Sequence, residues 1–257
     1  MIESEITPPQ KQYKVLLIGE TCTDIYEYGT CDRISPEAPV PVLQHTHQEC
    51  IHGMANNVFL NLKAFGIDCD FITNDAKELV KTRFIDSKSN QQILRQDVGY
   101  FVESKEITLD KEYDAIVISD YNKGLISEEN IRNICETFDG PIFVDSKRKD
   151  LTVFPNAILK INQYEWENAN WSDTNELIVT HGKKGAIYKE KIFRAPPVDV
   201  WDVTGAGDVF LACLCYYYLN TKDFYRTIPA CVELATQSVK RMGSYILKEE
   251  DIGQVRC

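Results

Sequence analysis

Short apolar runs that recur along the chain constrain its fold more than any other feature. Residues 14–19 (KVLLIG) form a continuous apolar run that ends in glycine, which is typical of a strand buried on both faces of a parallel sheet. Further strands are expected at 69–73, 114–119, 141–145, 157–161 and 177–180, and helices at 54–65, 127–138, 205–220 and 223–242. This alternation predicts an α/β fold with a doubly wound, mostly parallel sheet.

Two polar segments do not fit the core of such a sheet. Residues 28–50 carry Pro36, Pro39 and Pro41 among alternating apolar residues, which favours an exposed edge strand or flap. Residues 81–97 are polar and β-prone, and they fit a second piece of the same flap. We expect a single domain over residues 1–257 with a small β-flap, or lid, whose uncovered sheet face pairs with a second copy in a homodimer.

Composition excludes several classes of partner. The formal net charge of −11 and the lack of a basic run disfavour nucleic acid and anionic membrane surfaces. The N-terminus lacks a basic flank and an apolar core, and the sequence has no run of eighteen apolar residues, so neither secretion nor membrane insertion is expected. Nine scattered cysteines without a Cys-x-x-Cys pair indicate reduced thiols in a cytoplasmic protein and give no zinc motif.

The strongest chemical signal lies at residues 202–208 (DVTGAGD). Small residues at 205–207 leave backbone N–H groups uncovered where an apolar helix is expected to begin, and such amides bind anions. Asp208 follows directly and could accept a proton from a hydroxyl while the amides stabilise a transferring phosphoryl group. We expect Asp208 to be a catalytic base, and a glycine turn capped by Asp or Thr is the structural alternative.

The same run resembles the C-terminal motif of the ribokinase-like (PfkB) carbohydrate kinases, and other segments match that family in the same order. Residues 19–24 (GETCTD) resemble its first strand and turn, residues 162–165 its Asn-x-x-Glu element, and residues 180–185 (THGKKG) its nucleotide loop. The resemblance spans most of residues 14–244. It implies a ribokinase-like fold that uses ATP and Mg²⁺.

One branch of that family is matched more closely. Residues 33–42 (RISPEAPVPV) are similar to the heptose-7-phosphate kinases of lipopolysaccharide-precursor synthesis, and residues 81–83, 91–97 and 119–124 echo the same branch. The resemblance implies phosphoryl transfer from ATP to the anomeric hydroxyl of a heptose 7-phosphate. The chain has no His-x-Gly-His motif and no room for the nucleotidyltransferase domain that some of these kinases carry, so we expect the kinase alone.

The resemblance also implies roles for individual residues. The backbone amides of Gly205, Ala206 and Gly207 would form the anion hole beside Asp208. The acceptor sugar phosphate would contact Asp24, Gly53, Asn57, Lys81, Asp120 and Lys123. ATP would contact Asn162, Glu165, Thr180, Gly182, Gly185 and Thr204, and Asn162 and Glu165 would also hold Mg²⁺ through water.

Several of these residues have structural alternatives. Asp24 could cap a turn, although it follows the carboxyl end of the first strand, where open α/β sheets bind ligands. Asn162 and Glu165 could be first-turn helix residues, a role compatible with function. Lys123, Lys147 and Arg148 could be solvated surface charges or cations that contact phosphate.

Three departures from the family bear on specificity. Met54 stands where the family has the second glycine of a pair, and a side chain there could narrow the acceptor pocket. Residues 74–80 replace a strand and a helix, and Val232 replaces an asparagine close to the adenine. A kinase of another sugar, or a noncatalytic protein that binds sugar or nucleotide, are therefore the alternatives to a heptose kinase.

Overall fold

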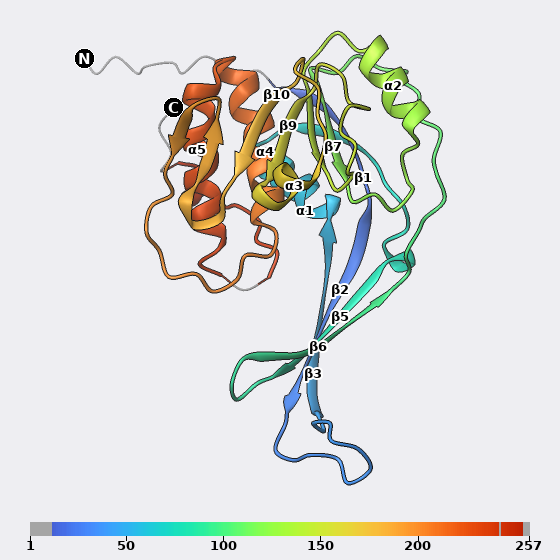
Figure 1. Cartoon of the computed structure of the whole chain (residues 1–257), viewed down its shortest axis with the longest axis vertical. Helices are drawn as coiled ribbons and strands as arrows, with labels where there is room; N and C mark the ends of the chain where they lie inside the picture. Colours follow the sequence, from blue (N-terminus) through green and yellow to red (C-terminus); the bar gives the residue numbers. More distant parts are fainter. Residues whose placement is uncertain (1–11, 242, 254–257) are drawn as a thin grey trace, which may run out of the picture.

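The computed structural model describes residues 12–241 and 243–253 (Figure 1). Its body is built on one eight-stranded sheet with the order β12-β11-β10-β9-β8-β7-β1-β4. Six neighbouring strands, from β10 to β4, run parallel, and β11 and β12 form an antiparallel hairpin at one edge. The bounds are β1 (Lys14–Gly19), β4 (Asp68–Ile72), β7 (Ala115–Asp120), β8 (Ile142–Ser146), β9 (Ile158–Asn162), β10 (Glu176–Thr180), β11 (Ala186–Tyr188) and β12 (Lys191–Phe193).

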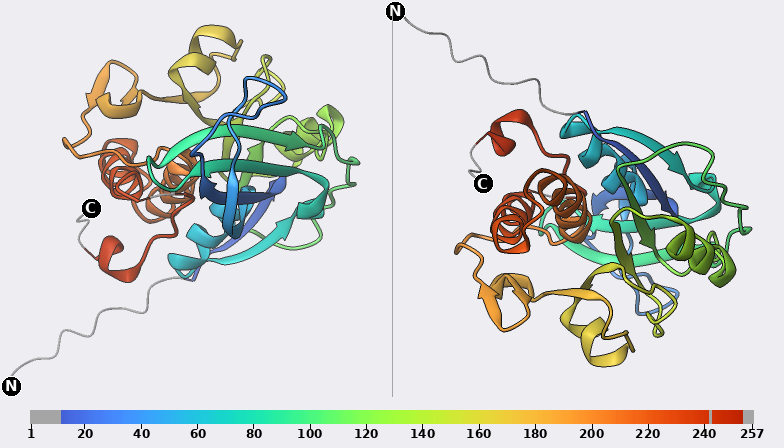
Figure 2. Two further views of the ribbon diagram at one scale, coloured as in Figure 1. Left: turned by 90° about the horizontal axis from the view of Figure 1, so that it is seen from below. Right: turned by 90° about the horizontal axis from the view of Figure 1, so that it is seen from above.

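Alternate residues of these strands enter two hydrophobic cores, one on each face of the sheet. Val15 and Leu17 pack against α1 (Ala55–Ala64), α4 (Ala206–Thr221) and α5 (Phe224–Ser238). Leu16 and Ile18 point to the other face, which α2 (Glu128–Thr137) and the loop around Phe154 cover. Figure 2 shows α4 and α5 side by side. The predicted doubly wound, mostly parallel sheet is thus confirmed.

A second sheet of four strands projects from the body as the lid (Figure 1). Its order is β3-β2-β5-β6, with β2 parallel to β5 and the outer strands antiparallel to their neighbours. The bounds are β2 (Thr21–Thr30), β3 (Gln44–Met54), β5 (Val80–Asp86) and β6 (Gln91–Val98). The lid begins earlier than expected, because β2 follows β1 after Glu20 alone and carries Asp24 into the lid.

The short connection between β4 and β5 leaves β4 as the last strand of the large sheet. Only residues 73–79 join these strands, and they contain one short 3₁₀ turn, Ala76–Glu78. Residues 99–114 return from the lid without regular structure and pass beside β4, where the Tyr113 hydroxyl donates to the Asp70 carboxylate at 2.9 Å. None of the helices in the described ranges is both long enough and apolar enough to cross a membrane.

Candidate active site

The site lies where the carboxyl ends of the parallel strands meet the first turn of α4. A cavity of about 710 Å³ opens there. Open α/β sheets bind ligands at this edge, because loops that leave successive strands converge on it. The polar side chains that line the cavity include Tyr121, Asp145, Lys160, Asn162, Thr180 and Asp208.

Residues 205–208 form the turn that the sequence predicts. Gly205 precedes α4 with φ of 78°, a left-handed conformation that favours glycine. A Cβ on Gly205 would also stand 2.6 Å from Asn57 Nδ2, so the site excludes a side chain there. The helix starts at Ala206, and its first backbone N–H groups have no partner within the helix. They form a suitable binding place for an anion beside the cavity.

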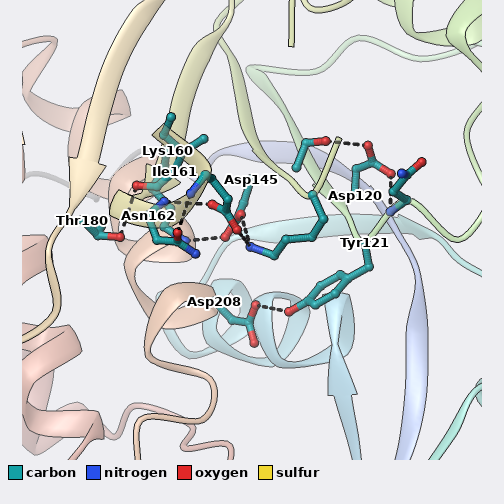
Figure 3. Close-up of polar contacts among 12 residues, drawn as sticks. Asp120, Tyr121, Asp145, Lys160, Ile161, Asn162, Thr180 and Asp208 are labelled. Atoms are coloured by element: carbon teal, nitrogen blue, oxygen red, sulfur yellow. Dashed lines mark hydrogen bonds and ion pairs between the residues drawn. The ribbon is translucent and has the colours of Figure 1, made fainter. Parts of the chain in front are cut away.

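Asp208 lies in the first turn of α4 and is only 6% exposed. The Tyr121 hydroxyl donates to its Oδ1 at 3.1 Å, as Figure 3 shows, and Asn57 Nδ2 donates to its Oδ2 at 3.3 Å. Burial raises the pKa of Asp208 to about 6, and the Asp145 carboxylate acts in the same direction, whereas Lys160 and the two hydrogen bonds oppose the rise. A carboxyl group with this pKa is mostly ionised at neutral pH and can still accept a proton.

Asn57 ties the first long helix to this turn. Besides Asp208, its amide contacts the Gly205 carbonyl at 3.3 Å. Asn61, one turn further along α1, donates to the Asn57 carbonyl at 2.8 Å and accepts from the Leu247 N–H at 2.9 Å. The structure therefore places Asn57 next to the predicted base, which it orients from α1.

A buried group of charges faces Asp208, and the sequence interpretation named Lys147 in it as a possible phosphate contact but missed Asp145 and Lys160. Asp145, near the end of β8, forms an ion pair with Lys160 of β9 (Figure 3). It forms a second ion pair with Lys147 at 3.0 Å. Lys160 is 3% exposed, and Lys147 also reaches Glu165 Oε1 at 2.5 Å. Although burial opposes ionisation, the two ammonium groups hold the pKa of Asp145 at about 2. Lysine within an apolar strand sequence was the only signal for Lys160.

Strand alternation decides which of these residues reach the cavity. Tyr121, Asp145 and Lys160 each lie an even number of residues from Val117, Phe143 and Ile158, which pack in the core against α4. They therefore extend from the α4 side of the sheet at its carboxyl edge.

Asp120 lies on the opposite side and does not reach the cavity, contrary to the sequence prediction. It is 0% exposed, pairs with Arg148 Nε at 2.6 Å, and accepts from the Ser146 hydroxyl at 2.7 Å and from the Asn122 N–H at 2.9 Å. These contacts leave no surface for a sugar. Arg148, which could have contacted phosphate, is engaged in the same network.

Glu20 is a second residue that the sequence interpretation missed. It is 0% exposed, and its carboxylate accepts hydrogen bonds from the backbone N–H groups of Tyr121 at 2.8 Å and Lys123 at 2.9 Å. Burial raises the pKa of Glu20, and the nearby Asp120 adds to the rise. Glu20 thereby fixes the loop that carries Tyr121 to the base.

Asn162 and Glu165 cap α3 (Gln163–Asn168) in a reciprocal pair of hydrogen bonds. The Glu165 N–H donates to Asn162 Oδ1 at 2.9 Å, and the Asn162 N–H donates to Glu165 Oε2 at 2.8 Å. With Oε1 on Lys147, both carboxylate oxygens are engaged. Nor do residues 12–241 and 243–253 contain a group of three or more His, Cys, Asp or Glu that could hold a metal. The residues therefore fit Mg²⁺ only through water and substrate phosphates.

The other end of the cavity is apolar and belongs to the predicted nucleotide side. Thr180, Gly182 and Gly185 line it, as the resemblance implies, and so does Val232. Thr204 does not: its hydroxyl donates to the Asp202 carboxylate at 2.7 Å and stabilises the turn before α4.

The predicted acceptor residue Asp24 lies on strand β2 of the lid, and two neighbouring side chains bury its carboxylate. Its carboxylate forms an ion pair with Arg83 of β5 and contacts the Cys22 thiol at 3.6 Å. A Cβ on Gly53 would stand 2.0 Å from Asp24 Oδ2, so this position of β3 has no room for a side chain. The buried hydroxyl of Tyr26, beside Arg83, has no hydrogen-bond partner among the described residues.

Lysines and Met54 complete this side. The Lys81 ammonium lies 5.4 Å from the centre of the Tyr121 ring, and Lys123 lies over Tyr100 at 6.0 Å. Neither lysine is part of the cavity lining. Met54 has φ of 59°, a conformation unusual for a residue with a side chain. Its side chain is buried in the core with Ile18 and is not part of the cavity lining. That lining includes none of the predicted acceptor residues, so a narrowing of the acceptor pocket by Met54 stays a prediction.

A doubly wound sheet with a lid, and a carboxylate at a helix N-terminus beside a deep cleft, define the class of small-molecule kinases with the ribokinase-like fold. Solved structures agree with that fold. Ribokinase from Thermotoga maritima aligns with a TM-score of 0.71 at 16% identity over 94% of this chain and 98% of that chain. Phosphofructokinase-2 from Escherichia coli aligns with a TM-score of 0.72 at 13% identity over 95% and 98%.

Sequence comparison gives the family. The model of the pfkB family carbohydrate kinases matches residues 158–251, and the chain carries a carbohydrate kinase domain of that family. Its members are phosphotransferases with an alcohol group as acceptor. The bifunctional protein HldE of Nitratiruptor sp. is 33% identical over 82% of this chain and 58% of its own length, and that of Campylobacter curvus is 31% identical over 91% and 63%. The chain thus spans about three fifths of these curated relatives.

Proposed function

We propose that this domain transfers the γ-phosphoryl group of ATP to the anomeric hydroxyl of a heptose 7-phosphate. The observation that carries the kinase assignment is the placement of Asp208: a nearly buried carboxylate in the first turn of α4, oriented by Tyr121 and Asn57, at the wall of the cleft. A noncatalytic protein has no need for such an arrangement, since burial of this carboxylate has a free-energy cost.

In the proposed reaction the acceptor hydroxyl lies between Asp208 and the γ-phosphorus. Asp208 takes the hydroxyl proton as the acceptor oxygen bonds to phosphorus and the bond to the β-phosphate oxygen breaks. The amides at the start of α4 are placed to bind phosphate oxygens. Mg²⁺, reached through water from Glu165 and Asn162, would neutralise part of the triphosphate charge.

Three observations support a phosphorylated acceptor. The face of the lid that carries Asp24 also carries Lys81 and Arg83, although the chain as a whole is acidic. The unpartnered Tyr26 hydroxyl beside Arg83 adds a polar group for a hydroxyl-rich ligand. Residues 33–42 resemble the heptose-7-phosphate kinases, and the relatives are bifunctional HldE proteins.

A coupled assay of ADP release against a panel of neutral and phosphorylated sugars tests this proposal. We expect the highest kcat/KM with heptose 7-phosphate and a loss of at least about a hundredfold in Asp208→Asn. Preference for another sugar would overturn the acceptor assignment, and equal turnover by the variant would overturn the role of Asp208.

We also propose that two copies associate through the lid. Strands β3 and β6 are the two edges of the lid sheet, and each presents mostly exposed residues. Exposed apolar side chains lie on the same part of the molecule, namely Ile34, Val40, Leu94 and Val98. An open sheet edge with apolar neighbours favours pairing with another sheet.

A further inference from the structure

Lys160 is the most buried cation among the residues that line the cleft. It lies inside β9, between the apolar residues Leu159 and Ile161, where a strand of a parallel sheet normally carries apolar side chains. A buried ion pair is often no more stable than an apolar pair of similar volume. Its position therefore calls for an explanation other than stability.

The Lys160 ammonium lies beside the first turn of α4. A Cβ built on Gly207, the second residue of α4, would stand 2.9 Å from Lys160 Nζ. The absence of a side chain at Gly207 thus lets the ammonium approach the same helix N-terminus that offers its backbone amides. Lys160 and Gly207 both line the cavity.

The contacts of Lys160 leave part of its hydrogen-bonding capacity unused. An ammonium group has three N–H donors, and Asp145 is its only hydrogen-bond partner among the described residues. Asp145 is shared with Lys147, whose ammonium also binds Glu165. The ion pair with Asp145 fixes the Lys160 ammonium, and its remaining N–H groups are available to a ligand in the cavity.

We propose that Lys160 is a second catalytic residue, whose ammonium contacts the phosphoryl group in transfer and stabilises the negative charge that passes to the leaving oxygen of ADP. The step balances with the proton on Asp208: the acceptor oxygen–phosphorus bond forms, the phosphorus–oxygen bond to the β-phosphate breaks, and its electron pair stays on ADP beside Lys160. This role rests on the proposed kinase function. It assigns Asp145 and Lys147 to positioning.

The test compares Lys160→Met with Lys147→Met, which removes the other lysine on the same carboxylate. For Lys160→Met we expect kcat to fall by about a hundredfold to a thousandfold, the usual loss for one preorganised donor, while the Kd of ADP changes by less than about fivefold. Lys147→Met should lose about tenfold or less. Equal losses in both variants, or a normal kcat in Lys160→Met, would overturn the proposal.

A second pair of variants guards against misfolding. Lys160→Met leaves Asp145 buried with one partner fewer, which destabilises a protein, whereas Asp145→Asn combined with Lys160→Met leaves neither charge. The double variant should have a kcat at least about tenfold below that of Asp145→Asn alone, and Lys160→Arg should retain more activity than Lys160→Met. Equal kcat values in the double variant and Asp145→Asn would contradict the role of Lys160.

The slow hydrolysis of ATP, with water as acceptor, separates this inference from the choice of sugar. If no sugar of the panel is phosphorylated but ATP hydrolysis shows the same dependence on Lys160, the proposed acceptor fails and the inference stands. If sugars are phosphorylated without that dependence, the inference fails and the kinase function stands. Absence of both reactions would overturn both.

Discussion

At the scale of single residues, the proposed role of Asp208 depends on the surroundings of its carboxylate. Its carboxylate combines burial, which favours the neutral form, with hydrogen bonds from Tyr121 and Asn57, which favour the charged form. The balance gives a pKa of about 6. This value suits a group that must take up a proton during the reaction near neutral pH.

The pH dependence of kcat/KM follows from this balance. As the proposed base, Asp208 would act only when ionised, so activity should be half of its maximum near pH 6, approach the maximum above about pH 7, and fall further below pH 6. Tyr121→Phe removes a hydrogen bond that lowers the pKa, and the acid limb should move up by about 0.5 to 1 pH unit. Profiles of both proteins check this. An unchanged acid limb in Tyr121→Phe would show that a group other than Asp208 sets the pH dependence of kcat/KM.

Gly53 provides a prediction for the acceptor side. Because a Cβ there would overlap the Asp24 carboxylate, Gly53→Ala should displace Asp24 from its pair with Arg83. We expect the KM of the acceptor to rise by about tenfold and the KM of ATP to stay within about twofold. Steady-state kinetics with each substrate varied in turn measures both. A rise in the KM of ATP alone would contradict the assignment of Asp24 to acceptor binding.

At the scale of elements, helix starts and strand ends build the site, and they differ in how well the sequence predicts them. Residues 14–19 and 205–208 were predictable, because an apolar run and a glycine turn act locally. Lys160 points to the face of the sheet that α4 covers, and Asp120 points to the opposite face, although both are buried. Which face each side chain takes depends on where the strand begins relative to α4, and only the packed structure shows this. Strands β11 and β12 escaped prediction because three residues carry too short a pattern.

The N-caps of α2 and α3 form a matched pair for separating stability from function. Ser127 caps α2 and does not line the cavity, whereas Asn162 caps α3 and does line it. Each alanine variant should lower the free energy of unfolding by about 1 kcal/mol. Only Asn162→Ala should also lower kcat, by about tenfold, because Asn162 orients Glu165 and through it Lys147. Denaturant unfolding and kinetics on both variants check this, and a similar kcat loss in Ser127→Ala would contradict it.

At the scale of the whole molecule, the eight-stranded sheet and the projecting lid have different proposed roles. The sheet places charged side chains at one edge, and the lid projects from the body (Figure 1). Asp24, Lys81 and Arg83 lie on lid strands β2 and β5, and Lys81 reaches the Tyr121 ring. The four-stranded lid sheet has two open edges, whose unpaired backbone N–H and C=O groups favour pairing with another sheet. In the proposed function the lid would thus serve both acceptor binding and self-association.

Light scattering at assay concentration should give twice the monomer mass of 29.4 kDa. A charged substitution on the lid, Leu94→Lys, should shift the mass toward that of the monomer, because it places charge among exposed apolar residues of β6. A monomer in the unmodified protein would exclude association through the lid.

The central claim is that Asp208 and its surroundings catalyse phosphoryl transfer from ATP to a heptose 7-phosphate. The most direct measurement is ³¹P NMR of the domain mixed with ATP, Mg²⁺ and heptose 7-phosphate. The account predicts ADP together with a new phosphate signal on the anomeric carbon, which is absent with Asp208→Asn. Release of inorganic phosphate alone, or the same product from the variant, would contradict it.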